Sequence, residues 1–95
     1  MGQTQEVRGV ATNISAEDGI TTIRYHQTAV VKFTGKQVIL DSGGWRTATT
    51  KTRMNQASNQ FDLNYGVYQE NGDWFVNLPN GETVPFVDGL IITRQ

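Results

Sequence analysis

The sequence contains no cysteine, a single histidine and two prolines. The lack of cysteine excludes disulfides, thiolate metal sites and thiol catalysis, and it fits a reducing compartment. A single histidine excludes a multi-histidine metal cluster, so we expect neither a metal nor a cofactor. There is no stretch of about 18 apolar residues, so we expect no transmembrane helix and no membrane partner. The polar residues 1–6 do not resemble a signal peptide.

What the chain does contain suffices for one small folded domain. Its 95 residues are 37% hydrophobic and 9% aromatic, which is enough for a compact core and argues against global disorder. The net charge of −1 hides a segregation: residues 20–60 carry six cations against Asp41 alone, whereas residues 61–95 carry five acids against Arg94 alone. Such segregation indicates either an anion-binding face or two segments that lie together and neutralise each other.

An antiparallel hairpin is predicted in the first half of the chain. From Thr21 to Phe33 apolar and polar residues alternate, which is typical of one long, half-buried strand. The side chains on its buried face are predicted to be Ile23, Tyr25, Ala29, Val31 and Phe33. Gly35-Lys36 suits a two-residue type II′ turn because glycine comes first. The register that follows places Phe33 opposite Val38.

Residues 47–61 are predicted to form a helix. Their apolar and small side chains share one helical stripe, made of Thr50, Met54, Ala57 and Phe61. Thr47 or Thr49 can accept the hydrogen bond that caps the start. Asn64 or Gly66 can end the segment in a left-handed conformation.

The last third of the chain predicts an antiparallel meander. Asn71-Gly72 joins two short apolar runs and is a strong hairpin motif, whose register places Tyr68 opposite Phe75. Pro85 argues that the next strand, over residues 83–87, lies at an edge or a bulge. A last strand is expected over residues 90–93.

The predicted fold class is therefore α+β: one antiparallel sheet of about five strands in the order ββ-α-βββ, with a single helix packed on it. Residues 20–95 are expected to form this one domain. Residues 1–19 are interpreted as a weakly ordered N-terminal arm or a short edge strand, with a strand around residues 7–11 and a turn at Asp18-Gly19.

Few residues suit catalysis. His26 lies on the predicted polar face of its strand, where a solvated side chain is the simpler interpretation. Asp41-Ser42-Gly43-Gly44 has the residues of a loop that holds a nucleophilic serine, but nothing else in the sequence indicates the base or the oxyanion donors that such a serine needs. A glycine turn between hairpin and helix explains the same four residues. We therefore expect no enzymatic activity.

The start of the predicted helix has the most binding chemistry. Glycines precede it, and cations and hydroxyls cluster where a helix presents unpaired N–H groups that suit phosphate. The amides that follow can read base edges, and a tryptophan can stack on a base. The candidate ligand-binding residues are Trp45, Arg46, Thr47, Thr49, Thr50, Lys51, Arg53, Asn55, Gln56 and Asn59. The alternative is a threonine-capped helix with ordinary surface cations, amides buried against a partner and tryptophans in the core.

The stretch GGWRTATTKTRMNQASNQF at residues 43–61, together with residues 67–69 and 74–76, resembles a group of short proteins encoded by tailed bacteriophages and marine viral genomes. The resemblance covers roughly residues 25–86. It implies a viral origin and a setting in the host cytoplasm, and it implies no particular activity.

These observations together predict a small, non-enzymatic phage accessory protein that binds a phosphate-bearing ligand, either nucleic acid or a nucleotide, through the basic helix start. The alternative is a protein-interaction module that inhibits a host enzyme or defence system through its helix or a free sheet edge. Self-association through the same edge is a further expectation.

Overall fold

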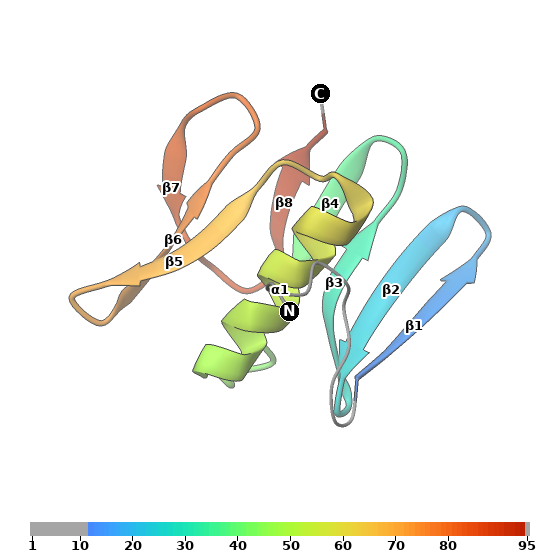
Figure 1. Cartoon of the computed structure of the whole chain (residues 1–95), viewed down its shortest axis with the longest axis horizontal. Coiled ribbons are helices and arrows are strands. Elements are labelled where there is room, and N and C mark those ends of the chain that lie inside the picture. The colour runs from blue at the N-terminus through green and yellow to red at the C-terminus, as the bar shows by residue number, and fades with distance from the viewer. Residues whose placement is uncertain (1–11, 95) are drawn as a thin grey trace, which may run out of the picture.

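The computed structural model describes residues 12–94, and this part of the chain forms eight strands and one helix (Figure 1). A five-stranded antiparallel sheet has the strand order β1-β2-β3-β4-β8. Its strands are β1 (Thr12–Glu17), β2 (Ile20–Tyr25), β3 (Thr28–Phe33), β4 (Gln37–Leu40) and β8 (Leu90–Thr93). The fold class is therefore α+β, as predicted.

A second, three-stranded antiparallel sheet has the order β5-β6-β7. Its strands are β5 (Gly66–Glu70), β6 (Asp73–Asn77) and β7 (Thr83–Pro85). The helix α1 (Ala48–Phe61) lies over the larger sheet, beside β5 (Figure 1). The sequence predicted a single sheet of about five strands, whereas the structure has two sheets, of five and three strands. The difference arises because the last strand, β8, pairs with β4 and not with the strands of the meander.

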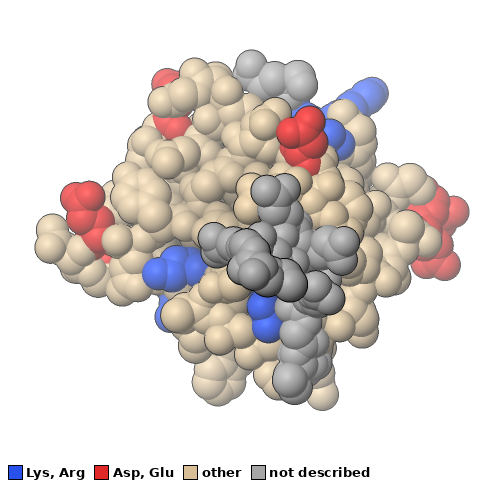
Figure 2. All heavy atoms as spheres, in the orientation of Figure 1, with Lys and Arg blue, Asp and Glu red and all other residues tan. Residues whose placement is uncertain are grey.

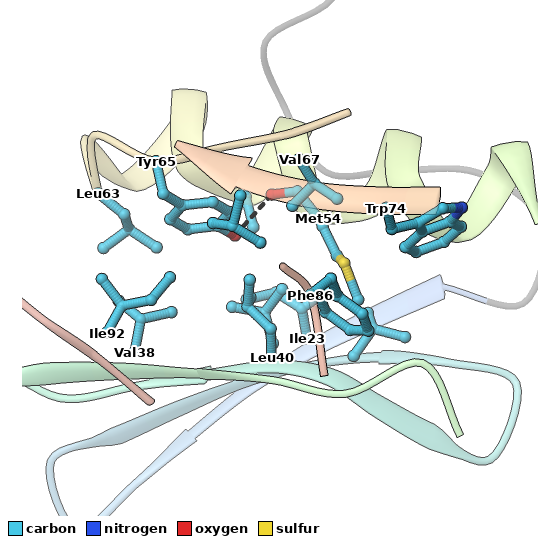
Figure 3. Close-up of a cluster of buried hydrophobic side chains, with 14 residues drawn as sticks. Ile23, Val38, Leu40, Met54, Leu63, Tyr65, Val67, Trp74, Phe86 and Ile92 are labelled. Carbon is cyan, nitrogen blue, oxygen red and sulfur yellow. Dashed lines mark hydrogen bonds between the residues drawn. The ribbon is translucent and has the colours of Figure 1, made fainter. Parts of the chain in front are cut away.

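The core fills the space between the five-stranded sheet on one side and α1 with β5 and β6 on the other (Figure 3). The fully enclosed side chains include Ile23, Val31, Val38, Leu40, Met54, Leu63, Val76 and Ile92. Tyr65 is buried among them, and its hydroxyl donates a hydrogen bond of 2.6 Å to the carbonyl of Met54. Burial raises the pKa of Tyr65 well above its ordinary value, so the hydroxyl remains a donor that fixes α1 against the chain that follows it.

The predicted long strand from Thr21 to Phe33 is two strands joined by a turn at His26-Gln27. His26 adopts a positive φ of 57° there. The pairing of β2 with β3 shifts register after Ile23, which pairs with Val31. This β-bulge at Val30 lets Val30 and Val31 both point into the core. Ala29 pairs with the exposed Arg24 and not with a residue of the buried face, so its predicted inward position was wrong.

Two other hairpins have the predicted registers. Phe33 pairs with Val38 across the turn at Gly35-Lys36. The turn is not type II′, however, because Gly35 does not adopt a positive φ. The hydroxyl of Thr34 instead accepts hydrogen bonds from the N–H groups of Lys36 and Gln37 and closes the turn. In the smaller sheet Asn71 and Gly72 both have positive φ, as their hairpin requires.

The helix starts and ends close to its predicted positions. Thr47 is the N-cap: its hydroxyl accepts a hydrogen bond from the N–H of Thr50. Asp62, rather than Asn64 or Gly66, is the left-handed residue that directly follows the helix. Pro85 ends β7, an edge strand of the smaller sheet, as its missing N–H predicts.

Candidate nucleic-acid interface at the start of α1

A groove of about 650 Å³ lies where the turn between β2 and β3 meets the loop that enters α1. One wall comes from Tyr25, His26, Gln27, Thr28 and Val30, and the other from Ser42, Trp45, Thr47 and Thr50. This volume lies within the roughly 300–1,000 Å³ of typical ligand sites. The walls combine aromatic rings with hydroxyl and amide groups, so the groove can both stack and hydrogen-bond a ligand.

The loop that carries Trp45 is fixed at its base by Ser42, which is 1% exposed. Asp88, from the loop before β8, accepts hydrogen bonds from the N–H and the hydroxyl of Ser42, at 2.8 and 2.7 Å. The backbone then turns at two glycines with positive φ, Gly43 and Gly44. Trp45 emerges with 70% of its surface exposed. An indole this exposed contributes little to the core and is presented to solvent at the groove.

Gly43 is a close-contact point between the two walls. A Cβ at this position would lie 2.5 Å from the Oγ1 of Thr28 and 2.8 Å from its Cγ2. Gly43 also has a φ of +63°, which L side chains rarely adopt. Only glycine therefore lets the Trp45 loop come this close to β3.

The opposite wall is built by the turn at His26-Gln27. The rings of Tyr25 and His26 lie 4.4 Å apart between centroids and form a tilted pair. The guanidinium of Arg53 lies 5.7 Å from the centre of the Tyr25 ring. Its Nε donates to the Thr12 hydroxyl and one Nη donates to the Gln56 amide oxygen. Because both partners are neutral, neither compensates the charge of Arg53.

The other two predicted cations lie over a different aromatic cluster. Arg46 is 5.0 Å from the Phe86 ring centre and 5.9 Å from that of Trp74. The ammonium of Lys51 is 5.6 Å from the Trp74 ring centre and donates to the amide oxygen of Gln69. The three cations therefore do not converge on one point, and Figure 2 shows basic side chains in separate places on the face that it presents.

The predicted hydroxyl and amide residues divide into two groups. Trp45, Thr47 and Thr50 line the groove, although Thr50 is 1% exposed and Thr49 is half-buried. The amide of Asn55 is engaged within the fold: it donates to the carbonyl of Val67 at 2.9 Å and accepts from the N–H of Val67 at 2.8 Å.

Gln56 accepts the hydrogen bond from Arg53, and Asn59 is exposed on the same helix. Sequence reasoning missed Tyr25, Gln27 and Thr28 as groove residues, because the turn that brings them to α1 was assigned to a continuous strand. The segregated charges interact at one point, since the charge of Arg46 from the basic segment lowers the pKa of Asp88 from the acidic one.

The Asp88 carboxylate gives the loop a dependence on pH. Partial burial raises its pKa, but the hydrogen bonds from Ser42 and the charge of Arg46 outweigh this, and the pKa lies below its ordinary value. A lowered folded-state pKa stabilises the fold above the unfolded value of about 3.9, and this contribution is lost as the pH falls towards the folded-state pKa. We expect the melting temperature of the native protein to fall more steeply below about pH 4 than that of Asp88→Asn.

Thermal unfolding of both proteins, followed by circular dichroism between about pH 7 and pH 2.5, measures this difference. The other carboxyl groups are common to both chains, so their effects cancel in the comparison. Parallel curves for the two proteins would contradict the role of Asp88.

Residues 12–94 hold no group of three or more histidine, cysteine, aspartate or glutamate side chains arranged to bind a metal ion. The one described helix lacks the length and apolar character needed to cross a membrane.

Comparison with known families places the protein among those of bacteriophages. A family model described as "Kyanoviridae Gp96 protein" matches residues 3–93, and the chain belongs to this family. The viral origin implied by the resemblance is thereby confirmed. No curated protein and no solved structure matches the chain.

Proposed function

We propose that the protein is a non-enzymatic accessory protein that binds nucleic acid across the start of α1, in the cytoplasm of the infected host. The observation that carries this proposal is the placement of Lys51 and Arg53. Both side chains donate hydrogen bonds to neutral groups. Lys51 lies over the ring of Trp74, and Arg53 lies over the ring of Tyr25. Because these hydrogen-bond partners are neutral, both side chains keep their positive charge: Arg53 lies beside the groove residue Tyr25, and Lys51 lies further away, beside Trp74.

This placement favours an extended ligand over a mononucleotide. The phosphates of a nucleotide are grouped at one end of the molecule and need cations that converge. The phosphates of a strand recur along its length, so separated cations can each neutralise one. Arg46 is expected to contribute less than the other two, because its charge already interacts with the carboxylate of Asp88.

Salt dependence tests the proposal directly. The native protein is expected to bind a short oligonucleotide at low salt, with an affinity that falls linearly on a logarithmic plot against salt concentration. Replacing Lys51 and Arg53 with glutamine should lower the affinity and reduce the slope by about 0.7 for each single-strand phosphate contact that is lost. Fluorescence anisotropy of a labelled oligonucleotide measures both quantities.

A matched control is the pair Lys32→Gln and Lys36→Gln, which removes the same charge from exposed positions outside the helix start. This pair should leave the slope unchanged. Equal effects of the two pairs would show that only net charge matters, and no binding of any oligonucleotide at low salt would overturn the proposal.

A second candidate function is a protein-interaction module that acts on a host enzyme or defence protein. It is favoured by two large apolar side chains at β8, which is an edge strand of the larger sheet within residues 12–94: Val87, just before it, is 53% exposed and Ile91 on it is 59% exposed. Such edges can accept a further strand. A stoichiometric complex with one host protein, insensitive to salt and nuclease and abolished by Ile91→Lys, would favour this function instead.

A further inference from the structure

We infer that the groove between the β2–β3 turn and the Trp45 loop accommodates one unpaired nucleobase, so that the protein prefers single-stranded nucleic acid to a duplex. This inference rests on the proposed function and deepens it. The cations explain attraction to phosphate but not the groove, since phosphate binding needs neither a cavity nor an exposed aromatic ring. The groove and its rings therefore call for a ligand with a flat, partly apolar component.

Aromatic side chains occur on both walls of the groove. Trp45 is 70% exposed and lines one wall, while the Tyr25–His26 pair lines the other. A base offers two faces for stacking, and single-strand binding proteins combine sequence-tolerant base–aromatic stacking with cations along the backbone. The positive φ of His26 and of Gly43 holds both walls in conformations that regular strand or helix would not give.

Polar groups in the groove match the edge of a base. The side chain of Gln27 is exposed and has both donors and acceptors, as base edges have, and Thr28 adds a hydroxyl group. Because an amide and a hydroxyl can each donate or accept, these groups would tolerate different bases. A base in a duplex has this edge paired and its faces covered, and so could not enter.

A phosphate next to the inserted base would meet a cation. Arg53 lies 5.7 Å from the ring centre of Tyr25, which is itself a groove residue, and its two hydrogen-bond partners are neutral. An apolar peptide or an uncharged acyl chain would gain nothing from this charge. The combination of stacking rings, ambivalent polar groups and one flanking cation is the chemistry of a single-stranded nucleotide unit.

The test compares three probes of equal phosphate number: a single-stranded oligonucleotide, the same strand with abasic sites throughout, and a blunt duplex. The single strand should bind more tightly than the other two. Trp45→Ala should weaken binding of the single strand about 5- to 150-fold, the loss expected when one stacked base loses its ring. Binding of the abasic strand should change little, and Trp45→Phe should restore most of the single-strand affinity.

The outcomes separate this inference from the proposed function. If none of the probes binds at low salt, the proposed function itself fails. If abasic and intact strands bind equally, or if Trp45→Ala weakens all three probes to the same degree, phosphate binding stands and the base-binding groove is overturned. Because Trp45 is largely exposed, its replacement should leave the melting temperature nearly unchanged, and this is measured alongside.

Discussion

Replacing Met54 with alanine is expected to lower the free energy of unfolding by about 2–5 kcal/mol, a large part of the 5–15 kcal/mol typical of a small domain. The side chain of Met54 is 0% exposed and points from α1 towards the larger sheet (Figure 3). Truncation removes its packing against both layers and leaves a cavity that the strands cannot easily close. Chemical denaturation measures the loss.

Met54→Leu is the matched control, since it nearly conserves volume and should cost less than about 1.5 kcal/mol. A small loss for alanine as well would mean that the helix can settle onto the sheet. The core would then be looser than the enclosed side chains indicate.

Asn55→Ala should lower the free energy of unfolding by about 2–4 kcal/mol, because two backbone groups lose their partner at once. The amide of Asn55 pairs with both the N–H and the carbonyl of Val67, a residue that is 4% exposed. In this way a helix side chain takes the place of a neighbouring strand along β5. Loss of the amide leaves both groups of Val67 without a hydrogen bond near the core.

Asn59→Ala on the same helix is the control for this prediction. Asn59 is exposed, and its replacement should change the free energy of unfolding by no more than about 0.5 kcal/mol. The comparison also separates two roles for the amides of α1. If Asn55→Ala reduced oligonucleotide affinity and left stability unchanged, Asn55 would be a ligand-binding residue and not a link between helix and sheet.

Sequence patterns predicted local pairing well where turn and strand chemistry agreed. Phe33 pairs with Val38, and Tyr68 pairs with Phe75 across Asn71-Gly72, as expected. In both hairpins a short loop fixes the register and places apolar residues opposite each other. Thr47 was likewise among the predicted helix caps, because capping depends on residues close in the chain.

The turn at His26-Gln27 could not be found from alternation alone. A two-residue turn shifts which residues face inward, and the bulge at Val30 shifts them back. Ile23, Val31 and Phe33 therefore keep the parity of an uninterrupted strand. Two local irregularities cancel in the hydrophobic pattern, and the groove wall that they create stayed hidden for the same reason.

The site could be predicted only in part. Trp45 and Thr47, two of the candidate ligand residues, line the groove, and the residues of its opposite wall come from a turn about twenty residues earlier in the chain. The spread of the cations depends on where α1 meets Trp74 on one side and Tyr25 on the other. Such placement follows from the packing of two sheets, which no short-range pattern records.

The contact of Gly43 with Thr28 bears on how any ligand is admitted. The backbone of Gly43 contacts the side chain of Thr28 without room for one added carbon. This contact fixes the distance between the two walls of the groove before a ligand binds. Little backbone conformational entropy would be lost on binding, because the groove is already formed in the free protein. A preformed groove implies fast association with no rearrangement of the backbone.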